Sequence, residues 1–299
     1  MAVDVSVNVS NHYPFKLAVP SLGFDILVPN CSPGDPYILV AEASTDIIEV
    51  QPKQPITVNG YGLIHKLPAK LTNICPGKET SPLDLLVSSY IQGLETIIYV
   101  RGADAPSRAT PLWIVDLVKS VTVPVPITGD DFGHLIQNFS MTNAHFYLPD
   151  SMAEPGTPES QPKVSATVNV LVNLPEQMNF SVDIPRVRSF ADVYYQDRKF
   201  GFIDLRKWQA ANATHVNNTV NGNPLLKLQF GFDRAPLQVT DDDVLTEVLQ
   251  KLIFAKKPVT LHVKAIVDGE VKTSLGQFVI RDIPAAGKVK VKRELLALL

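Results

Sequence analysis

The sequence predicts an all-β protein built from two tandem β-sandwiches, each with one or two short helices. Apolar residues alternate with polar ones over short runs, as Val3, Val5, Val7 and Val9 do, and this period of two is typical of a half-buried strand. The 24 prolines lie mostly beside such runs, where they suit strand ends and disfavour long helices. The chain also resembles itself at a distance of about 160 to 165 residues, which indicates a duplicated unit.

Short runs of this kind, bounded by proline, glycine or asparagine, predict the strands of the first half. The expected strands are 3–9, 15–19, 22–28, 37–41, 47–50, 56–63, 96–100 and 113–125. A helix is expected after Ser81, because this capping serine is followed by Pro82 and by Asp84 in the first turn. Apolar residues at helical spacing follow, and Gly93 ends the helix.

The second half follows the same pattern. Two further helix starts are expected at Thr128 and Thr240, each followed by aspartates that complement the free N–H groups of a helix. The expected strands are 138–148, 164–172, 179–184, 190–195, 200–205, 225–232, 259–267, 271–280 and 289–291. The segment 149–163 is rich in Pro, Ser, Gly and Glu and predicts a flexible loop, and the Asn-rich stretch 212–223 predicts an exposed turn.

The internal repeat sets the predicted domain boundary. Residues 7–20 have a later echo in residues 170–185, since both comprise an alternating strand, an Asn…Pro turn and a strand closed by proline. We therefore expect a first sandwich at 1–126 and a second, complete one at 127–299. The second has a helix and a strand ahead of its turn, at 128–148, for which the first has no room. This predicts that the first sandwich lacks its N-terminal part and that the chain is a piece of a longer protein.

The sequence contains no motif of a known active site, nucleotide site or metal centre. Its six histidines are scattered without the spacing of metal ligands. The aspartates after Thr128 and Thr240 are interpreted as helix N-terminal residues and not as cation ligands. We therefore predict no catalytic, cofactor-binding or metal-binding residue and no enzymatic activity. Trp113 and Trp208 are expected to fill cores.

The charge pattern argues against a nucleic-acid partner. The formal net charge is −3 and charged residues make up 19% of the chain, so no global field attracts a polyanion. Lys288, Lys290 and Lys292 alternate with valines and are interpreted as the solvated face of an edge strand, which lysines protect from aggregation. RNA binding would require aromatic residues between these charges, and this run contains none.

Two signals bear on the compartment and they disagree. The N-terminus has no leader and no apolar run reaches the roughly 20 residues that span a bilayer, which read literally predicts a soluble protein without an export signal. Sequons for N-glycosylation, which matter only in a secretory compartment, are nevertheless frequent. They are Asn8, Asn138, Asn179, Asn212 and Asn217. Cys31 and Cys75 are open to two interpretations, two free thiols or a disulfide between two loops of the first sandwich.

The recurring order of a strand, an Asn…Pro turn and a strand ending in proline resembles the group-2 late-embryogenesis-abundant (LEA-2) domain. That domain is an immunoglobulin-like β-sandwich with a helix, so the resemblance implies two immunoglobulin-like, LEA-2-like sandwiches in tandem. Both copies depart from the family's Asn-Pro marker, because the turns run from Asn11 to Pro14 and from Asn173 to Pro175.

A narrower resemblance is carried by residues 128–150, 174–180, 204–208, 239–244 and 283–287. These stretches resemble the C-terminal part of a family of large fungal vacuolar-membrane proteins, which have one membrane helix and a long luminal array of such sandwiches. The family is associated with the termination of autophagy, and some members are labelled as pre-rRNA processing proteins. The resemblance implies a glycosylated module on the luminal side of the vacuolar membrane, anchored only through a segment outside this chain.

Three functions remain in competition at this point. The leading hypothesis is a non-enzymatic luminal interaction or scaffold module with protein partners still to be identified, acting in the termination of autophagy. The alternative is a lipid-binding sandwich, which would require an elongated apolar cavity. A second alternative is a cytosolic or nuclear pre-rRNA processing factor, which would require a basic surface.

Overall fold

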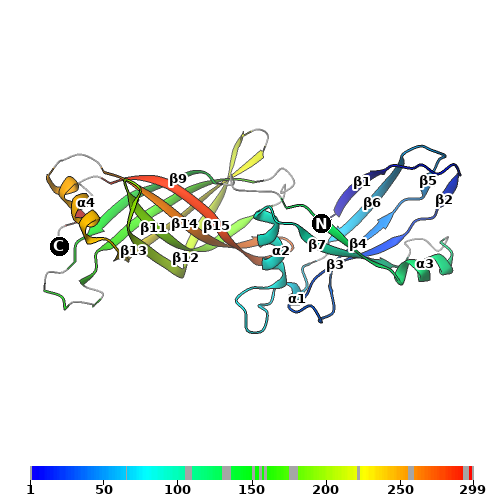
Figure 1. Ribbon diagram of the computed structural model, residues 1–299, viewed down its shortest axis with the longest axis horizontal. Helices are drawn as coiled ribbons and strands as arrows, with labels where there is room; N and C mark the ends of the chain where they lie inside the picture. Colours follow the sequence, from blue (N-terminus) through cyan, green and yellow to red (C-terminus); the bar gives the residue numbers. More distant parts are fainter. Residues whose placement is uncertain are drawn as a thin grey trace. The chain divides into compact units, whose positions relative to one another are not determined.

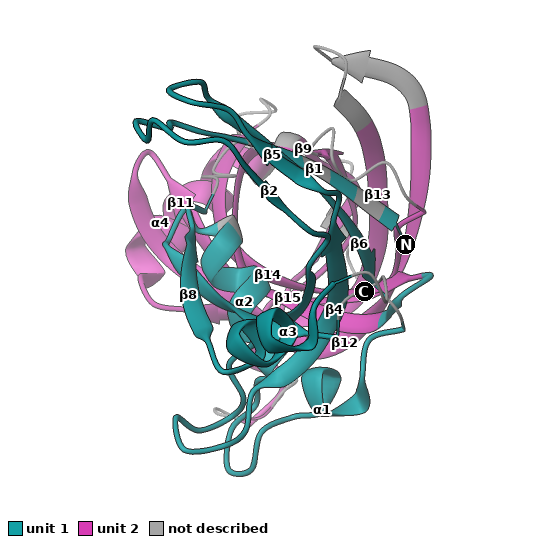
Figure 2. Cartoon of the chain, turned by 90° about the vertical axis from the view of Figure 1, so that its right-hand side faces the viewer, with its two compact units in different colours: residues 1–131, 274–276 teal, residues 132–273, 277–299 magenta. Residues whose placement is uncertain are grey.

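A computed structural model describes residues 2–64, 66–104, 110–129, 136–149, 152–154, 157, 160–174, 181–220, 223–254, 259–291 and 296–297. The described residues are mostly β-strand with few short helices, which confirms the predicted all-β class. The chain divides into two compact units, one of residues 1–131 with 274–276 and one of residues 132–273 with 277–299 (Figure 2). In each unit an extended sheet curls instead of lying flat.

The first unit is built on a six-stranded sheet with the order β1-β6-β4-β3-β7-β8. Its strands are β1 (Ala2–Val9), β3 (Gly23–Val28), β4 (Ile38–Thr45), β6 (Ile56–Ile64), β7 (Thr96–Ala103) and β8 (Thr122–Ile127). A separate antiparallel pair is formed by β2 (Leu17–Val19) and β5 (Ile48–Val50). Most of these strands lie within one or two residues of the predicted ones, because their alternating pattern is local and strong.

Helix α2 (Pro82–Ile91) begins where the sequence predicts. The Ser81 hydroxyl accepts a hydrogen bond from the Asp84 N–H at 3.1 Å, and the Asp84 carboxylate accepts one from the Ser81 N–H at 2.9 Å. This reciprocal capping box satisfies two N–H groups of a helix start that is buried. Gly93, with φ of 72°, follows the helix in the left-handed conformation that suits its C-terminus. A short helix that the sequence did not predict, α1 (Ala69–Thr72), precedes α2.

The stretch 113–125, predicted as one strand, is a helix followed by a strand. Helix α3 (Leu112–Lys119) begins after Pro111, and β8 begins at Thr122. The prediction was wrong because the apolar residues fit both periods. Trp113, Val115 and Leu117 alternate as in a strand, whereas Ile114, Leu117 and Val118 have helical spacing. Only Val115 of α3 is buried, and Trp113 is 68% exposed. The expected core position of Trp113 is therefore wrong as well.

Helix α3 approaches the first sheet closely at Gly102 of β7. A Cβ atom at this glycine would stand 2.3 Å from the carbonyl of Val118 in α3. We expect Gly102→Val to displace α3 and to lower the free energy of unfolding by about 1–3 kcal/mol, the usual cost of overpacking. Gly34→Val is the matched control, because a Cβ there would meet no atom within 4 Å. Thermal unfolding of both variants tests this, and equal effects would contradict the close contact.

The second unit is an eight-stranded sheet with the order β15-β14-β11-β12-β13-β10-β9-β16. Its strands are β9 (Ile136–Tyr147), β10 (Lys163–Asn173), β11 (Asp183–Tyr195), β12 (Arg198–Val220), β13 (Asn223–Val239), β14 (Val259–Thr273), β15 (Gly276–Val291) and β16 (Leu296–Ala297). Helix α4 (Asp242–Phe254) connects β13 to β14, as the helix start at Thr240 predicts. Figure 1 shows α4, in orange, at one end of the long curling strands of this unit.

Several strands of the second unit are longer than predicted. The Asn-rich stretch 212–223, expected as an exposed turn, belongs to β12 as far as Val220 and to β13 from Asn223. In this stretch β12 pairs with β13, from Ala211 opposite Phe230 to Val216 opposite Leu225. This pairing outweighs the low strand propensity of asparagine. Of the helix predicted to start at Thr128, residues 130–135 lie outside the described residues, Thr128 and Gly129 are not helical, and Ile136 begins β9. Much of the loop 149–163 also lies outside the described residues.

The core of the second unit lies on the concave face of its curled sheet. Strands from opposite sides of the sheet approach each other through side chains, since Phe139 and Met141 of β9 pack against a buried cluster that includes Val289 of β15. A Cβ atom at Gly287 would stand 2.1 Å from the Phe139 ring, so glycine is needed for this approach. One sheet thus encloses the core from opposite sides, as the two layers of a sandwich do.

Candidate functional site

Helix α4 covers part of the concave face of the second unit. Val244, Val248 and Leu252 follow one another at intervals of four residues and are between 0% and 3% exposed, so they form its buried side. They belong to the same buried cluster as Phe200 of β12 and Leu237 of β13. The helix therefore closes the core of the second unit with an entirely apolar face.

The start of α4 is fixed by Asp241. Its carboxylate accepts a hydrogen bond from the Val244 N–H at 3.0 Å and forms a 3.5 Å ion pair with Arg198 at the start of β12. The Val244 N–H and then the Arg198 guanidinium lower the pKa of Asp241 below its usual value. The aspartates after Thr240 therefore act at a helix start, and the capping residue is Asp241.

This lowered pKa predicts a dependence of stability on pH. A carboxylate whose pKa is lower in the folded state contributes stability above its unfolded pKa of about 3.9, and this contribution is lost as the pH falls further. We expect the melting temperature to fall less between about pH 5 and pH 3 in Asp241→Asn than in the unmodified chain. Asp242→Asn is the control, since it changes the same charge one residue away. Identical pH profiles for all three proteins would contradict the capping role.

An apolar cavity lies between α4 and the sheet. Its volume is about 70 Å³, and the atoms that face it are apolar, including those contributed by His145. It is lined by Met141, Ala144, His145, Phe146, Val164, Val193, Phe200, Leu237, Leu245, Val248, Leu249, Leu252, Leu261, Val263, Val289 and Val291. One water molecule needs roughly 10–15 Å³ by this measure, but it also needs polar partners, which this wall does not offer. The cavity therefore suits a hydrocarbon group better than water.

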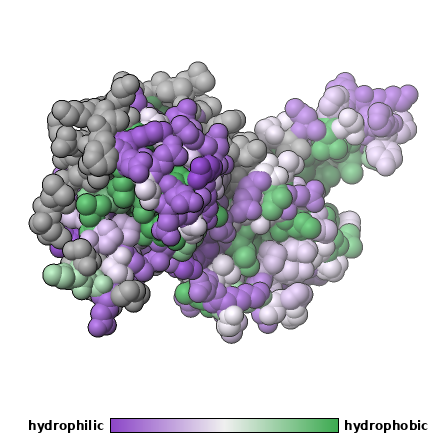
Figure 3. Space-filling view, turned by 60° about the vertical axis from the view of Figure 1, so that its left-hand side comes forward, coloured by the Kyte–Doolittle hydropathy of each residue, from purple (hydrophilic) through white to green (hydrophobic). Residues whose placement is uncertain are grey.

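Figure 3 turns the α4 side of the second unit toward the viewer and shows apolar residues at the surface among strongly polar ones. On the side of α4 toward β11, Lys251 donates hydrogen bonds to Glu247 at 2.8 Å and to the Tyr195 hydroxyl at 2.5 Å. These two partners, Glu247 first, raise the pKa of Lys251 and keep it charged. The helix is thus attached to the sheet by a polar contact as well as by its apolar face.

The convex face of the same sheet is polar and aromatic. The guanidinium carbons of Arg186 and Arg188 each lie 5.1 Å from the centre of the Trp208 ring. Trp208 is half-buried between two cations and not inside the core, where the sequence placed it. Cation–π contacts of this kind stabilise the charged side chains on the sheet surface.

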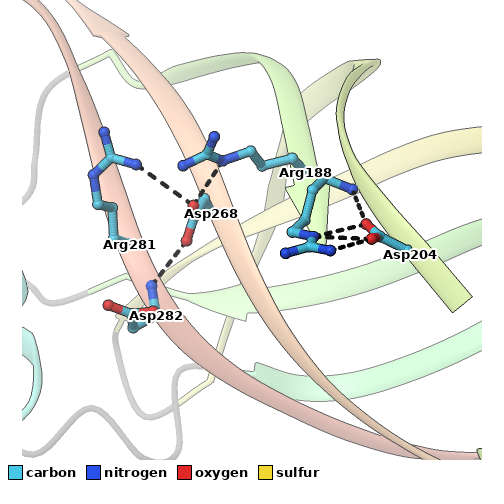
Figure 4. Close-up of polar contacts among 6 residues, drawn as sticks. Arg188, Asp204, Asp268, Arg281 and Asp282 are labelled. Carbon is cyan, nitrogen blue, oxygen red and sulfur yellow. Dashed lines mark hydrogen bonds and ion pairs between the residues drawn. The ribbon is translucent and has the colours of Figure 1, made fainter. Parts of the chain in front are cut away.

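The arginines of this face are paired with carboxylates (Figure 4). Arg188 donates to Asp268 at 2.8 Å, and Arg281 forms a 3.6 Å ion pair with the same carboxylate. Arg186 donates to Glu270 at 2.7 Å, and Arg206 donates to Asp204 at 2.9 Å. Contact with Arg206 lowers the pKa of Asp204, and contact with Glu270 raises the pKa of Arg186. These four arginines share three carboxylates, so most of the positive charge that this network would present to a polyanion is compensated.

Neither of the two cysteines singled out in the sequence is among the residues that line the cavity. Cys31, in the loop between β3 and β4, and Cys75, between α1 and α2, form a disulfide with a Cα–Cα distance of 5.5 Å. Cys75 is 1% exposed. The structure thus brings together the two cysteines that the sequence left open between thiols and a disulfide.

The sequon asparagines lie on different strands. Asn8 on β1, Asn138 on β9 and Asn212 on β12 are exposed. Asn217 lies in β12, and Asn179 lies outside the described residues. Within the described part of the chain, no group of three or more His, Cys, Asp or Glu side chains could hold a metal ion. Nor does any described helix have the length and apolar character needed to cross a bilayer.

Sequence reasoning missed the cavity, because its wall is contributed by strands and a helix far apart along the chain. A partial signal was present in the alternation of β11, in which every second residue from Val187 to Tyr195 is buried and the residues between are only half-buried. Such alternation identifies the concave face but not a space left within it. The Trp208 stack was missed for the same reason, since Arg186 and Arg188 approach it from a neighbouring strand.

Two comparisons with known proteins give a match to this chain. Residues 178–292, most of the second unit, match the family model of the Tag1 C-terminal domain. A protein of Saccharomyces cerevisiae described as uncharacterized, YLR173W, is 23% identical over 300 residues, which cover 94% of this chain and 47% of the yeast protein. The chain therefore spans about half the length of the curated relative that it matches. Residues 178–292 are therefore similar to a Tag1 C-terminal domain, and the chain as a whole is distantly similar to a fungal protein.

Proposed function

We propose that the chain is a non-enzymatic interaction module on the luminal side of the fungal vacuolar membrane, held there by a segment outside residues 1–299. The observation that carries this proposal is the disulfide between Cys31 and Cys75. Disulfides persist in oxidising compartments and are rare in the cytosol. The exposed sequons at Asn8, Asn138 and Asn212 support the same compartment, because glycans are added only in the secretory pathway.

The experiment for this location is glycan mapping of the protein purified from a fungal host. We expect glycans on at least one of Asn8, Asn138 and Asn212, detected as a mass that an N-glycosidase removes. Thr214→Ala is a matched variant for the third site, since it destroys the sequon and leaves Asn212 itself unchanged. Peptides that carry no glycan at any of these asparagines would contradict the luminal location.

The interaction role is supported by exposed apolar residues on the first unit. Leu112, Trp113 and Leu117 of α3 are between 59% and 79% exposed, and large apolar side chains in such a group are typical of protein contact sites. We expect proximity labelling in the vacuole lumen to identify proteins whose labelling falls with Trp113→Asp. Asp116→Asn on the same helix is the control. Unchanged labelling in the tryptophan variant would contradict a role for α3.

The proposal extends to the termination of autophagy, for which the resemblance of residues 239–244 and 283–287 to the fungal family is the support. In cells that carry the Trp113→Asp variant of the full protein, we expect autophagy to continue after it stops in the parent strain. A normal shut-off in these cells would contradict this extension while leaving the luminal location untouched.

A second candidate function, binding of a lipid or another apolar molecule, is favoured by the cavity beneath α4. At about 70 Å³ the cavity is smaller than the roughly 150 Å³ apolar cavity that holds a benzene ring, so it accommodates only the end of a hydrocarbon chain. Leu249→Trp would place a larger side chain in this space, whereas Thr246→Trp changes an exposed position of the same helix. We expect native mass spectrometry to detect a bound lipid in the unmodified chain and in Thr246→Trp, and less of it in Leu249→Trp. Equal occupancy in all three would contradict binding at this cavity.

The remaining alternative, a cytosolic or nuclear pre-rRNA processing factor, has less support. The arginines of the convex face pair with Asp204, Asp268 and Glu270, so their charge is largely compensated. A disulfide is also rare in those compartments.

A further inference from the structure

The disulfide between Cys31 and Cys75 joins two loops that are each held by hydrogen bonds of their own. In the loop between β3 and β4, the Cys31 N–H donates to the Asn30 side chain at 2.8 Å, and the Asn30 amide donates to the Pro36 carbonyl at 3.0 Å. In the loop between α1 and α2, the Cys75 N–H donates to the Thr80 carbonyl at 2.9 Å. Local turns therefore position both cysteines, in addition to the covalent bond between them.

The two halves of the disulfide differ in burial. Cys75 is 1% exposed, whereas Cys31 is half-buried. Thiol–disulfide exchange begins when an attacking thiolate reaches one of the two sulfur atoms, so access decides which sulfur is attacked. The difference in burial favours attack at Cys31 and makes Cys75 the leaving group. Because Cys31 is only half-exposed, a small thiol reaches it more easily than a folded protein does.

A positive charge stands beside Cys31. The Lys78 amine, from the loop that contains Cys75, donates to the Cys31 carbonyl oxygen at 3.3 Å. An ammonium group in this position attracts an incoming thiolate and stabilises the thiolate that leaves. The carboxylate of the Cys31 loop, Asp35, accepts a hydrogen bond from the Ser32 N–H at 3.1 Å and so is engaged within its own turn. Lys78 thus places its charge next to the cysteine that an outside thiol reaches first.

We propose that Cys31 is a site of reversible mixed-disulfide formation with a low-molecular-weight thiol of the glutathione type. In the reductive direction, the thiolate of the small molecule attacks the Cys31 Sγ atom and the bond to Cys75 breaks. Its electron pair leaves on the Cys75 Sγ atom, which takes a proton from water. In the oxidative direction, the Cys75 thiolate attacks the mixed disulfide at Cys31 and expels the small thiol. Exchange at Cys31 does not depend on the compartment proposed above.

The first test uses the oxidised 299-residue chain. It is exposed briefly to reduced glutathione, the exchange is stopped with acid, and peptides are mapped at low pH without reduction. We expect glutathione on Cys31, with Cys75 as the free thiol, in about tenfold excess over the reverse pattern. In concentrated urea, where burial no longer distinguishes the two sulfurs, the ratio should fall to about one.

Two matched variants measure the same preference from the oxidative side. Cys75→Ser leaves Cys31 as the single thiol and Cys31→Ser leaves Cys75, and both variants lack the same bond. With glutathione disulfide as the probe, we expect Cys31 to form the mixed disulfide about tenfold faster than Cys75. Hydrogen exchange of β3 and β4 shows whether the first unit stays folded in these variants. If it unfolds, the measurement on the oxidised chain decides.

Lys78→Met separates an electrostatic role of this lysine from a role as a link between the loops. Loss of the charge should slow exchange with glutathione about threefold, whereas loss of a link alone would loosen the loops and speed exchange. Lys78→Arg keeps the charge and should keep the rate. Lys70→Met is the control, because it removes an exposed lysine of α1 in the same unit.

Three results would overturn the proposal. One is glutathione on Cys75 as often as on Cys31 in the oxidised chain without urea. Another is an equal rate of mixed-disulfide formation in the two single-cysteine variants while both remain folded. The third is exchange in Lys78→Met at the unmodified rate or faster, because the charge would then not promote attack at Cys31.

Discussion

Cys75→Ser is expected to lower the free energy of unfolding of the first unit by about 4 kcal/mol in the chain-entropy description of a cross-link. The disulfide joins residues 44 positions apart, so it removes a large part of the freedom of the unfolded chain between β3 and α2. In addition, Cys75 is 1% exposed, so serine would place a hydroxyl in an apolar position. Hydrogen exchange of the strands β3, β4 and β7 against urea concentration measures the loss.

A non-additivity test accompanies this prediction. Because Cys31→Ser and Cys75→Ser remove the same bond, the double variant should be little less stable than either single variant. Reduction of the unmodified chain should have a similar effect. Losses that add up in the double variant, or single losses well below about 1 kcal/mol, would contradict a stabilising bond between these residues.

Phe200→Ala is expected to destabilise the second unit by about 3–5 kcal/mol, the usual cost of removing a buried aromatic ring. Phe200 is 2% exposed, belongs to the main buried cluster and lines the cavity beneath α4. The truncation enlarges a space that is already present, so neighbouring side chains must collapse or leave a larger void. Urea unfolding followed by hydrogen exchange of β12 and α4 gives the magnitude.

Phe202→Ala is the matched control for this change, since Phe202 lies two residues along the same strand. The two rings contact different partners, because Phe202 packs against Phe190 with ring centres 5.1 Å apart and lies beneath the Lys199 amine. Phe202 is only half-buried, so its loss should cost markedly less. Similar losses for the two variants would contradict the assignment of Phe200 to the closed core.

Local patterns predicted what depends on neighbours in the chain. The capping box of Ser81 and Asp84 predicted α2, the acidic run after Thr240 predicted α4, and alternation predicted most strands. The prediction failed at α3 because its apolar residues fit a period of two as well as helical spacing. Local pattern alone therefore did not distinguish the helix, in which Val115 is buried, from a strand. Likewise β12 continues through its asparagines because β13 pairs with them.

The candidate site depends more strongly on contacts between distant residues. The sequence singled out Cys31 and Cys75, but only the folded loops bring their Cα atoms to 5.5 Å. Trp208 was expected in a core because it is large and apolar, whereas two arginines from β11 make a half-exposed position favourable. The cavity forms only because α4 lies across strands that are distant in the sequence. Met141 of β9 and Leu261 of β14, for example, both line it although more than a hundred residues separate them.

The luminal location is the central claim, and the redox state of the two cysteines in living cells tests it most directly. Cells are treated with acid to stop thiol exchange, free thiols are alkylated, and the peptides that contain Cys31 and Cys75 are analysed without and with reduction. The proposal predicts that the two peptides are linked to each other in nearly all molecules and take up label only after reduction. If Cys31 and Cys75 were alkylated without reduction in most molecules, they would be free thiols in the cell. This result would contradict a location in an oxidising lumen and would favour the cytosol.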